Sequence, residues 1–445
     1  MIPTETGPVV PSSPYRGLNA YAEADAPFFF ARDRERRTVV ASLDARPLTV
    51  LFGPSGVGKS SLLSAGVAAD LRDRARTNLE LRGEPELAVA VFRTWSGDPV
   101  VGLAHAVRAA VAQSFGEGEP AMTAPAGASL TDVFAEATAR AGELYLILDQ
   151  VDEYFLYNTP EDGVWTLAAE LGRALARNDV RPRVLLSIRE DALGALDRFT
   201  PLLPGVFQGL LRIEHLDLAG ARAAILRPLE SYNRAAGTQI QIEDPLVDAI
   251  LEESMFGGVE PGSTRADRRI EAAYLQLVMQ RLWDEELQAG SSTLRYETFQ
   301  RLGGAVRISR GFLDEALAFL APDEQEIASD AFRLLVTPSG AKVALGLSDL
   351  ADYVGRPIEE LEPVLEKLAA ARIVRRVAGL DVDLDPRFEI FHDLLGPAIL
   401  DWRARRAAER SYAERYDLAK RYRLALAACA VLAVIVVALA VLAAR

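Results

Sequence analysis

The pattern with the clearest chemical meaning is a glycine-rich segment at residues 53–60, which reads Gly-Pro-Ser-Gly-Val-Gly-Lys-Ser. Glycines let successive backbone N–H groups turn toward one centre, where they can bind phosphate oxygens. Lys59 could reach the β- and γ-phosphates, and the Ser60 hydroxyl could bind Mg²⁺. A helix that opens at Ser61 would add positive potential. We therefore predict that a nucleotide is bound by Gly53, Pro54, Ser55, Gly56, Val57, Gly58, Lys59, Ser60 and Ser61.

An acidic group follows an apolar run, Leu144–Leu148, that is typical of a strand buried on both faces. Asp149, directly after this run, could join Ser60 in the shell of a Mg²⁺ ion. Asp152 and Glu153 follow, and either could act as a general base on the attacking water. We favour Glu153 and leave Asp152 open. The alternative is a solvated acidic turn after a core strand.

A third apolar run, Val184–Ile188, ends in Arg189. In an open α/β sheet ligands collect at the carboxyl ends of the strands. Arg189 would then face the phosphates and could stabilise the charge of the transition state. The alternative is a local ion pair with Glu190 or Asp191.

These residues need a sheet to position them. Two further apolar runs, Leu87–Phe92 and Leu210–Ile213, and the one that ends at Phe52, bring the number of expected strands to five. Helical patterns alternate with the strands, which is typical of a parallel sheet covered by helices. The sequence therefore predicts an α/β P-loop NTPase fold.

Composition excludes several other classes. The chain has 445 residues, one cysteine and three histidines, so it is neither a disulfide scaffold nor a Cys/His zinc protein. The net charge is −14, although residues 402–423 hold eight basic and only three acidic side chains. The rest of the chain is therefore strongly acidic, which makes nucleic acid an unlikely partner.

Residues 424–444 form an uncharged apolar run of 21 residues. A helix of this length spans roughly 31 Å, close to the hydrocarbon thickness of a membrane. Basic residues, Trp402 and three tyrosines precede the run, and this combination favours the cytoplasmic side of a membrane interface. The first ten residues lack the features of a signal peptide. We expect a single-pass anchor in the cytoplasmic membrane with the N-terminal body in the cytoplasm.

With these residues in place, the chain resembles the STAND NTPases (signal-transduction ATPases with numerous domains), of the novel, prokaryote-rich class. The resemblance rests on GPSGVGKSSLLSAGV, LDQVDEYF, LLSIREDAL and the entry segment PYRGLNAYAEADAPFFFARDRE. In the family this entry segment packs near the adenine, so the resemblance implies that Arg32 binds nucleotide. Ala31 stands where the family has glycine.

The resemblance also implies two further domains. Residues 216–300 read as helices without strands and are similar to the family's helical lid, in which the Pro228 region approaches the nucleotide. Residues 320–400 read as helix, strand, helix, helix and strand, at 329–336, 339–345, 347–354, 358–377 and 388–402, and are similar to a winged-helix domain. Its histidine, here His392, contacts the β-phosphate of ADP in the family. The expected division is an entry segment (1–30), an NTPase domain (31–215), a lid (216–305), a winged helix (306–400), a basic juxtamembrane helix (401–423) and a transmembrane helix (424–444).

Three functions remain open. The first is a membrane-anchored signalling switch, for example in stress or phage response, which binds ATP or ADP with Mg²⁺, hydrolyses ATP slowly, and clusters or binds a protein partner when active. The second is an ATPase that remodels or transports a membrane partner. The third is a scaffold that binds nucleotide without turnover. No residue here reads the base, so ATP is the family's expectation rather than a result of the pattern, and GTP stays open.

Overall fold

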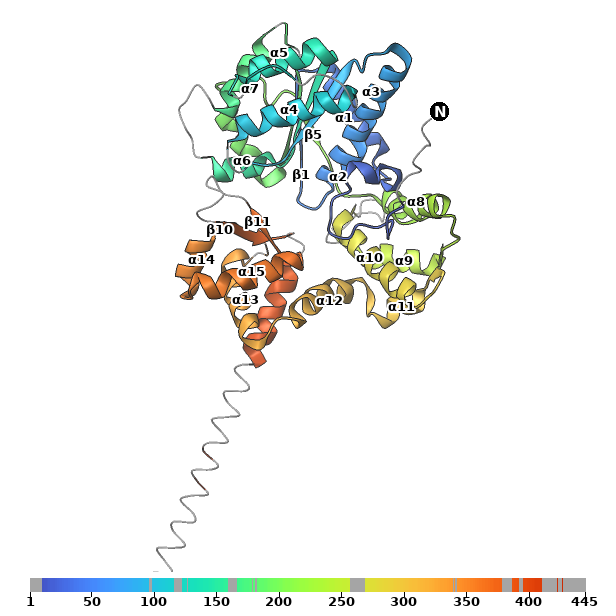
Figure 1. Ribbon diagram of the computed structural model, residues 1–445. Helices are drawn as coiled ribbons and strands as arrows, with labels where there is room; N and C mark the ends of the chain where they lie inside the picture. The colour runs from blue at the N-terminus through green and yellow to red at the C-terminus, as the bar shows by residue number, and fades with distance from the viewer. Residues whose placement is uncertain are drawn as a thin grey trace, which may run out of the picture.

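The computed structural model describes most of the chain. The described residues are 10–95, 98–115, 122–125, 127–158, 166–177, 179–180, 182–256, 269–338, 340, 342–377, 386–391, 395–409, 422 and 426. Three parts of the fold follow one another along the chain (Figure 1). Each has its own cluster of buried apolar side chains.

A parallel five-stranded sheet forms the first part, as the apolar runs predicted. Its strands are β1 (Leu48–Gly53), β2 (Leu87–Phe92), β3 (Glu143–Leu148), β4 (Pro182–Arg189) and β5 (Leu210–Arg212), in the order β2-β3-β4-β1-β5. Alternate residues of a strand face opposite sides of a sheet, and both sides are buried along β1 to β4, whereas the edge strand β5 is exposed at Leu210 and Arg212. Val50 packs into one apolar cluster and Leu51 into the other. This burial on both faces explains why the strands read as continuous apolar runs.

Helices cover both faces of this sheet (Figure 1). One face carries α1 (Asp33–Ala45) and α3 (Ala69–Arg82), and the other carries α4 (Pro99–Phe115), α5 (Leu130–Ala141) and α7 (Leu167–Ala176). Short helices α6 (Val151–Tyr157) and η3 (Glu190–Phe199) follow β3 and β4. Both therefore begin at the carboxyl edge of the sheet, where the predicted site residues also lie.

The helix after the glycine-rich loop is continuous but not uniform. It begins with α2 (Lys59–Ser61), passes through a π-helical stretch, η2 (Leu62–Ala68), and continues as α3. All seven residues of η2 are buried. A left-handed Gly83, with φ of 79°, ends α3 because glycine takes this conformation without a steric penalty.

Five helices form the second part, which we call the helical unit. They are α8 (Leu218–Ala236), α9 (Asp244–Glu253), α10 (Ala272–Gln288), α11 (Tyr296–Arg301) and α12 (Gly304–Ala318). The expectation of helices without strands is wrong. Two short pairs are present, β6 (Gln241–Ile242) with β9 (Thr293–Leu294) and β7 (Met255–Phe256) with β8 (Arg269–Ile270). Ladders of two residues are too short to leave a periodic signal in the sequence.

The third part, which we call the C-terminal unit, has three helices before residue 371, a fourth helix over residues 395–409, and a small antiparallel sheet. The first three helices are α13 (Pro322–Leu335), α14 (Leu347–Val354) and α15 (Ile358–Ala370), and the sheet has the order β10 (Leu345–Gly346), β12 (Arg387–Ile390), β11 (Val374–Val377).

Two expectations for this unit are corrected. The helix expected over 358–377 ends at Ala370, because the chain turns at Arg372, with φ of 60°, and continues as strand β11. The strand expected over 388–402 ends at Ile390, and residues 395–409 are helical. The apolar pattern did not separate a short strand from the helix that follows it.

Among the described residues, no helix is long and apolar enough to cross a membrane. The expected anchor, residues 424–444, lies outside the described residues except for Leu426. Its basic flank is described only to Glu409 and at Tyr422. The membrane anchor therefore stays a prediction.

Candidate nucleotide site

A cavity of about 320 Å³ lies at the carboxyl edge of the parallel sheet. Its walls come from the entry segment, the glycine-rich loop, the ends of β2, β3 and β4, the helical unit and the C-terminal unit. The volume is within the range of small-molecule sites. Twelve of the predicted site residues line it: Arg32, Ser55, Gly56, Val57, Gly58, Lys59, Ser60, Ser61, Asp149, Asp152, Arg189 and Pro228. Gly53, Pro54 and Glu153 lie just outside this lining, and His392 is not among the described residues.

The glycine-rich loop has the backbone path that a phosphate cradle requires. Gly56 and Gly58 are left-handed, with φ of 74° and 96°. A methyl group at Gly58 would meet no atom within 4 Å, so the loop is open on that side. At Gly53 a methyl group would lie 2.4 Å from the carbonyl oxygen of Ile213, so only glycine fits between β1 and the chain after β5.

Lys59 points into this loop. Its Nζ donates to the carbonyl oxygens of Gly53 (2.7 Å) and Pro54 (2.9 Å). Burial lowers the pKa of Lys59 from 10.5 to about 8, against the opposing effect of the Asp152 and Asp149 carboxylates. A bound polyphosphate would favour the charged ammonium, so the loop and its lysine fit that ligand.

Asp149, at the end of β3, is almost fully buried, with 1% of its surface exposed. Its Oδ1 accepts a hydrogen bond from the backbone N–H of Gln150 (3.1 Å). Within the part of the chain that the structure describes, Oδ2 has no hydrogen-bond donor, although the Arg93 Nε lies 3.3 Å away. A buried carboxylate oxygen without a donor, in the same cavity wall as the Ser60 hydroxyl, fits the ligands that Mg²⁺ prefers.

The two candidate bases occupy different surroundings. Asp152 lines the cavity and accepts a hydrogen bond from the backbone N–H of Arg189 (3.3 Å). Burial raises its pKa, although Arg189 and Lys342 oppose that shift. Glu153 instead contacts Arg375 of the C-terminal unit, with 2.6 Å between Oε1 and Nη2. Burial raises the pKa of Glu153 to about 7, because it outweighs the effect of the Arg375 guanidinium.

Arg189 is both a cavity residue and a member of a local ion pair. It lines the cavity at the end of β4, and its guanidinium donates two hydrogen bonds to Asp191, at 3.0 and 2.6 Å. In this arrangement the local pair orients the guanidinium at the cavity wall.

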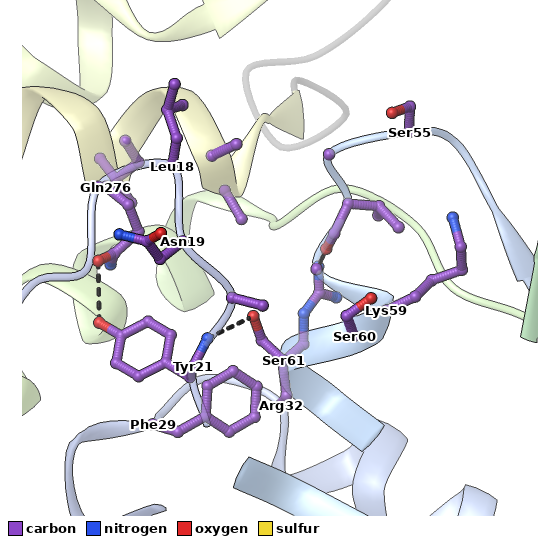
Figure 2. Close-up of a pocket in the computed structure, with 18 of the residues that line it drawn as sticks. Leu18, Asn19, Tyr21, Phe29, Arg32, Ser55, Lys59, Ser60, Ser61 and Gln276 are labelled. Carbon is purple, nitrogen blue, oxygen red and sulfur yellow. Dashed lines mark hydrogen bonds between the residues drawn. The ribbon is translucent and has the colours of Figure 1, made fainter. Parts of the chain in front are cut away.

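The entry segment supplies another wall, which Figure 2 shows with the loop residues. Arg32 is buried, and it donates to the carbonyl oxygen of Val57 (2.9 Å) and to Glu35 (2.7 Å). Ala31 has φ of 72°. The chain therefore keeps at Ala31 a left-handed path that a glycine would adopt more easily.

Tyr21 joins the loop to the helical unit (Figure 2). Its backbone N–H donates to Ser61 Oγ (3.1 Å), and its hydroxyl donates to Gln276 Oε1 (2.9 Å). Gln276 lies on α10 and also accepts from the backbone N–H of Arg16 (3.1 Å). The entry segment is thus fixed between the phosphate loop and α10.

Sequence reasoning missed several lining residues, among them Tyr21, Arg93, Gln276, Lys342, Arg375 and Phe391. Arg93 had a usable signal, because it directly follows strand β2 just as Asp149 follows β3 and Arg189 ends β4. The others gave none. Gln276 meets Tyr21 across 255 residues of sequence, and Arg375 meets Glu153 across 222.

The parallel sheet with a glycine-rich loop after β1 and an aspartate after β3 defines a P-loop ATPase-like fold. The model of the family Novel STAND NTPase 1 (nSTAND1) matches residues 14–429, and the chain belongs to this family. The resemblance drawn from the sequence motifs is confirmed at the level of the family.

Solved structures with a similar fold are remote. They include the Orc1 protein of Aeropyrum pernix in complex with DNA (14% identity, 84% of this chain and 93% of that chain, TM-score 0.44). The Walker-type ATPase paby2304 of Pyrococcus abyssi has 17% identity over 86% of this chain and 98% of its own, with a TM-score of 0.41. The Drosophila ORC bound to DNA has 15% identity over 89% and 88%, with a TM-score of 0.40. No curated protein matches the chain.

Two of these structures contain DNA, and the comparisons give no support to the expectation that nucleic acid is an unlikely partner. At TM-scores of 0.40–0.44 the likeness does not decide what this chain binds. The expectation stays a prediction.

Proposed function

We propose that the chain is a nucleotide-dependent molecular switch that binds ATP or ADP in the cavity and hydrolyses ATP slowly. One observation carries the proposal: a single cavity is walled by the phosphate loop, the entry segment, the helical unit and the C-terminal unit. A ligand there would lie between walls from every part of the fold. If ATP and ADP differ in affinity for the open and closed arrangements, exchanging one for the other shifts the population between them.

Within this proposal the cavity residues have separate roles. Lys59 and the loop N–H groups bind the phosphates, and Arg189 lies where it can stabilise negative charge. Ser60 and Asp149 would hold Mg²⁺, which neutralises phosphate charge when bound. Asp152 or Glu153 would accept the proton of the attacking water. Arg32 and Pro228 lie in the walls that the family resemblance assigns to the nucleotide.

We also propose that the C-terminal unit is a winged-helix domain. Helices α13, α14 and α15 and the antiparallel sheet β10-β12-β11 support that assignment. Phe391, the residue before His392, lines the cavity. A contact between His392 and the β-phosphate is therefore part of the proposed closed state.

Signalling from a membrane is the proposed setting. It rests on the apolar run at 424–444 and its basic flank in the sequence. In this proposal the chain from residue 395 onward, which is helical over residues 395–409, connects the C-terminal unit to the anchor. The body would then lie in the cytoplasm.

The test is nucleotide content and turnover of the purified full-length chain. We expect ADP to be extracted from the wild-type protein and hydrolysis to be far slower than about one turnover per second, below the usual range of enzymes. Lys59→Ala and Asp149→Asn should abolish hydrolysis, and Lys59→Ala should also lose the nucleotide. Lys367→Ala is the matched control, because Lys367 lies on α15 and pairs with Glu324 away from the cavity.

The outcomes separate the three functions. Rapid turnover by a protein that purifies without nucleotide would favour an ATPase that works on a membrane partner. Tight nucleotide binding without any hydrolysis would favour the third function, a scaffold. A chain that neither retains nor binds nucleotide would refute the proposal.

A further inference from the structure

An ion pair connects the acidic segment after β3 to the C-terminal unit. Arg375 lies on β11 and Glu153 on α6, and their Nη2 and Oε1 atoms are 2.6 Å apart. The Glu153 side chain is 12% exposed and that of Arg375 is 26% exposed. The pair is therefore largely shielded from solvent, unlike most surface ion pairs of this protein.

Two more charged residues complete the cluster on the C-terminal side. Glu389 of β12 accepts from Arg375 Nε (2.5 Å) and from Lys342 Nζ (2.7 Å), and its side chain is 4% exposed. The C-terminal unit thus places two cations, Arg375 and Lys342, and one anion, Glu389, at its contact with α6. Glu153 supplies the second anion from the other side. Among these four residues the charge balances only when the two parts of the fold are in contact.

The ion pair with Arg375 restricts the position of the Glu153 carboxylate. Asp152, its neighbour, lines the cavity, but the Glu153 side chain does not, while Arg375 and Lys342 do. The carboxylate is therefore held against β11 at the edge of the cavity. To act on a water molecule beside the phosphates, it would have to leave Arg375.

We propose that Arg375 is a positioning residue that restrains Glu153 and thereby makes the C-terminal unit an inhibitor of hydrolysis. This inference rests on the proposed function, since it needs a nucleotide in the cavity to have an effect on turnover. Movement of the C-terminal unit away from the sheet releases Glu153.

Arg375→Gln in the full-length chain tests the restraint, and Arg376→Gln is its matched control. Arg376 is the next residue on the same strand, is exposed, and lies 3.9 Å from Glu366, away from the cavity. At saturating ATP and Mg²⁺ we expect Arg375→Gln to hydrolyse roughly fivefold faster or more, the change that follows from losing a restraint of about 1 kcal/mol. Arg376→Gln should hydrolyse at the wild-type rate. Arg375→Lys, which keeps the charge but loses the planar fork, should fall between wild type and Arg375→Gln.

A second measurement reads the contact without any nucleotide. Hydrogen exchange at the amides of α6 and β11 should be faster in Arg375→Gln than in wild type, and unchanged in Arg376→Gln. A variant that merely unfolds would lose protection throughout the sheet as well. Arg375→Lys then provides the folded protein in which the same local change is sought.

Three results would overturn the inference. Turnover by folded Arg375→Gln at or below the wild-type rate would mean that Arg375 does not restrain the site. Unchanged exchange at α6 and β11 would mean that the pair does not hold the two parts together. An equal rise in turnover in Arg376→Gln would mean that the faster hydrolysis of Arg375→Gln is a general effect of losing a positive charge. If wild type neither binds nor hydrolyses nucleotide, the proposed function fails and the effect on hydrolysis fails with it, while the exchange measurement still decides the contact.

Discussion

The hydroxyl of Tyr21 donates a hydrogen bond of 2.9 Å to Oε1 of Gln276, and this bond joins the entry segment to α10 at the wall of the cavity. Burial raises the pKa of Tyr21 well above its ordinary value, so the hydroxyl keeps its proton. The Gln276 amide oxygen also accepts from the backbone N–H of Arg16. One side chain of the helical unit therefore fixes two points of the segment that covers the phosphate loop.

Gln276→Leu removes the Oε1 atom that accepts both hydrogen bonds and keeps a side chain of similar size. We expect a loss of roughly 1–3 kcal/mol in stability, because the partly buried N–H of Arg16 loses its partner and the buried Tyr21 hydroxyl keeps only the carbonyl oxygen of Pro14, at 3.1 Å. Nucleotide affinity should fall as well, since the entry segment would be less fixed. Chemical denaturation and a binding titration measure the two effects. Gln276→Glu keeps an acceptor and should lose less, and Gln288→Leu, at the exposed end of the same helix, should change neither property.

Ala31→Gly should stabilise the protein. Ala31 has φ of 72°, a conformation that costs an L-residue about 1–2 kcal/mol, whereas glycine adopts it freely. Glycine also makes the unfolded chain more flexible, so the net gain should be about 0.5–1 kcal/mol. The matched control is Ala41→Gly, in the exposed interior of α1, which should lose about 1 kcal/mol. Thermal unfolding of both variants is the measurement, and equal losses in the two would show that Ala31 is not strained.

The raised pKa of Glu153 predicts that the free energy of unfolding depends on pH. Burial raises its pKa to about 7 in the folded chain, above the value of 4.5 expected when it is unfolded. The folded state therefore holds this proton more tightly, and the contribution of Glu153 to stability falls as the pH rises from about 4.5 to about 7. At about 1.4 kcal/mol per pKa unit, the loss of stability is at most roughly 3.5 kcal/mol.

Glu153→Gln isolates that contribution. The amide resembles the protonated acid, so the two proteins should be equally stable near pH 4.5, and the variant should become relatively more stable up to pH 7 and no further above it. Denaturant unfolding at several pH values gives the difference. If the variant instead became relatively less stable with rising pH, the Arg375 ion pair would outweigh the cost of burial.

The Arg93–Asp149 pair predicts an energetic coupling. Asp149 is buried, and Arg93 Nε lies 3.3 Å from its Oδ2. Arg93 also donates a hydrogen bond to Ser64 in η2. Arg93→Ala should cost roughly 1–3 kcal/mol of stability, because it leaves a buried carboxylate without its cation.

In an Asp149→Asn background the cost of Arg93→Ala should be clearly smaller, and this difference is the coupling. The exposed pair Arg82–Glu86 of α3 and the loop after it is the control, and its coupling should be much weaker. A coupling no larger than that of the control would show that Arg93 and Asp149 act independently. Unfolding in denaturant provides all the values.

The sheet could be predicted because strands β1 to β4 contain continuous apolar runs, and because parallel strands place their carboxyl ends at one edge. Lys59 was found from the glycine-rich pattern, and Asp149 and Arg189 from their places at the ends of strands, a rule that Arg93 obeys too. Strand β11 escaped prediction because Val374–Val377 continues the apolar spacing of α15. The contacts of Gln276 and Arg375 could not be predicted, since they depend on how separate units pack and leave no local pattern. The phosphate contact of His392 and the membrane anchor at 424–444 remain predictions.

The order of the cavity walls along the chain bears on how the protein is made. All five strands of the sheet have been synthesised by Arg212, whereas Lys342, Arg375 and Phe391 follow more than a hundred residues later. At about 5–20 residues per second, the ribosome needs roughly 10–35 s to cover that interval. Throughout this time a nascent chain with a folded sheet presents its phosphate loop without the last wall. Nucleotide can therefore enter before the C-terminal unit exists, and the finished protein can leave the ribosome already loaded.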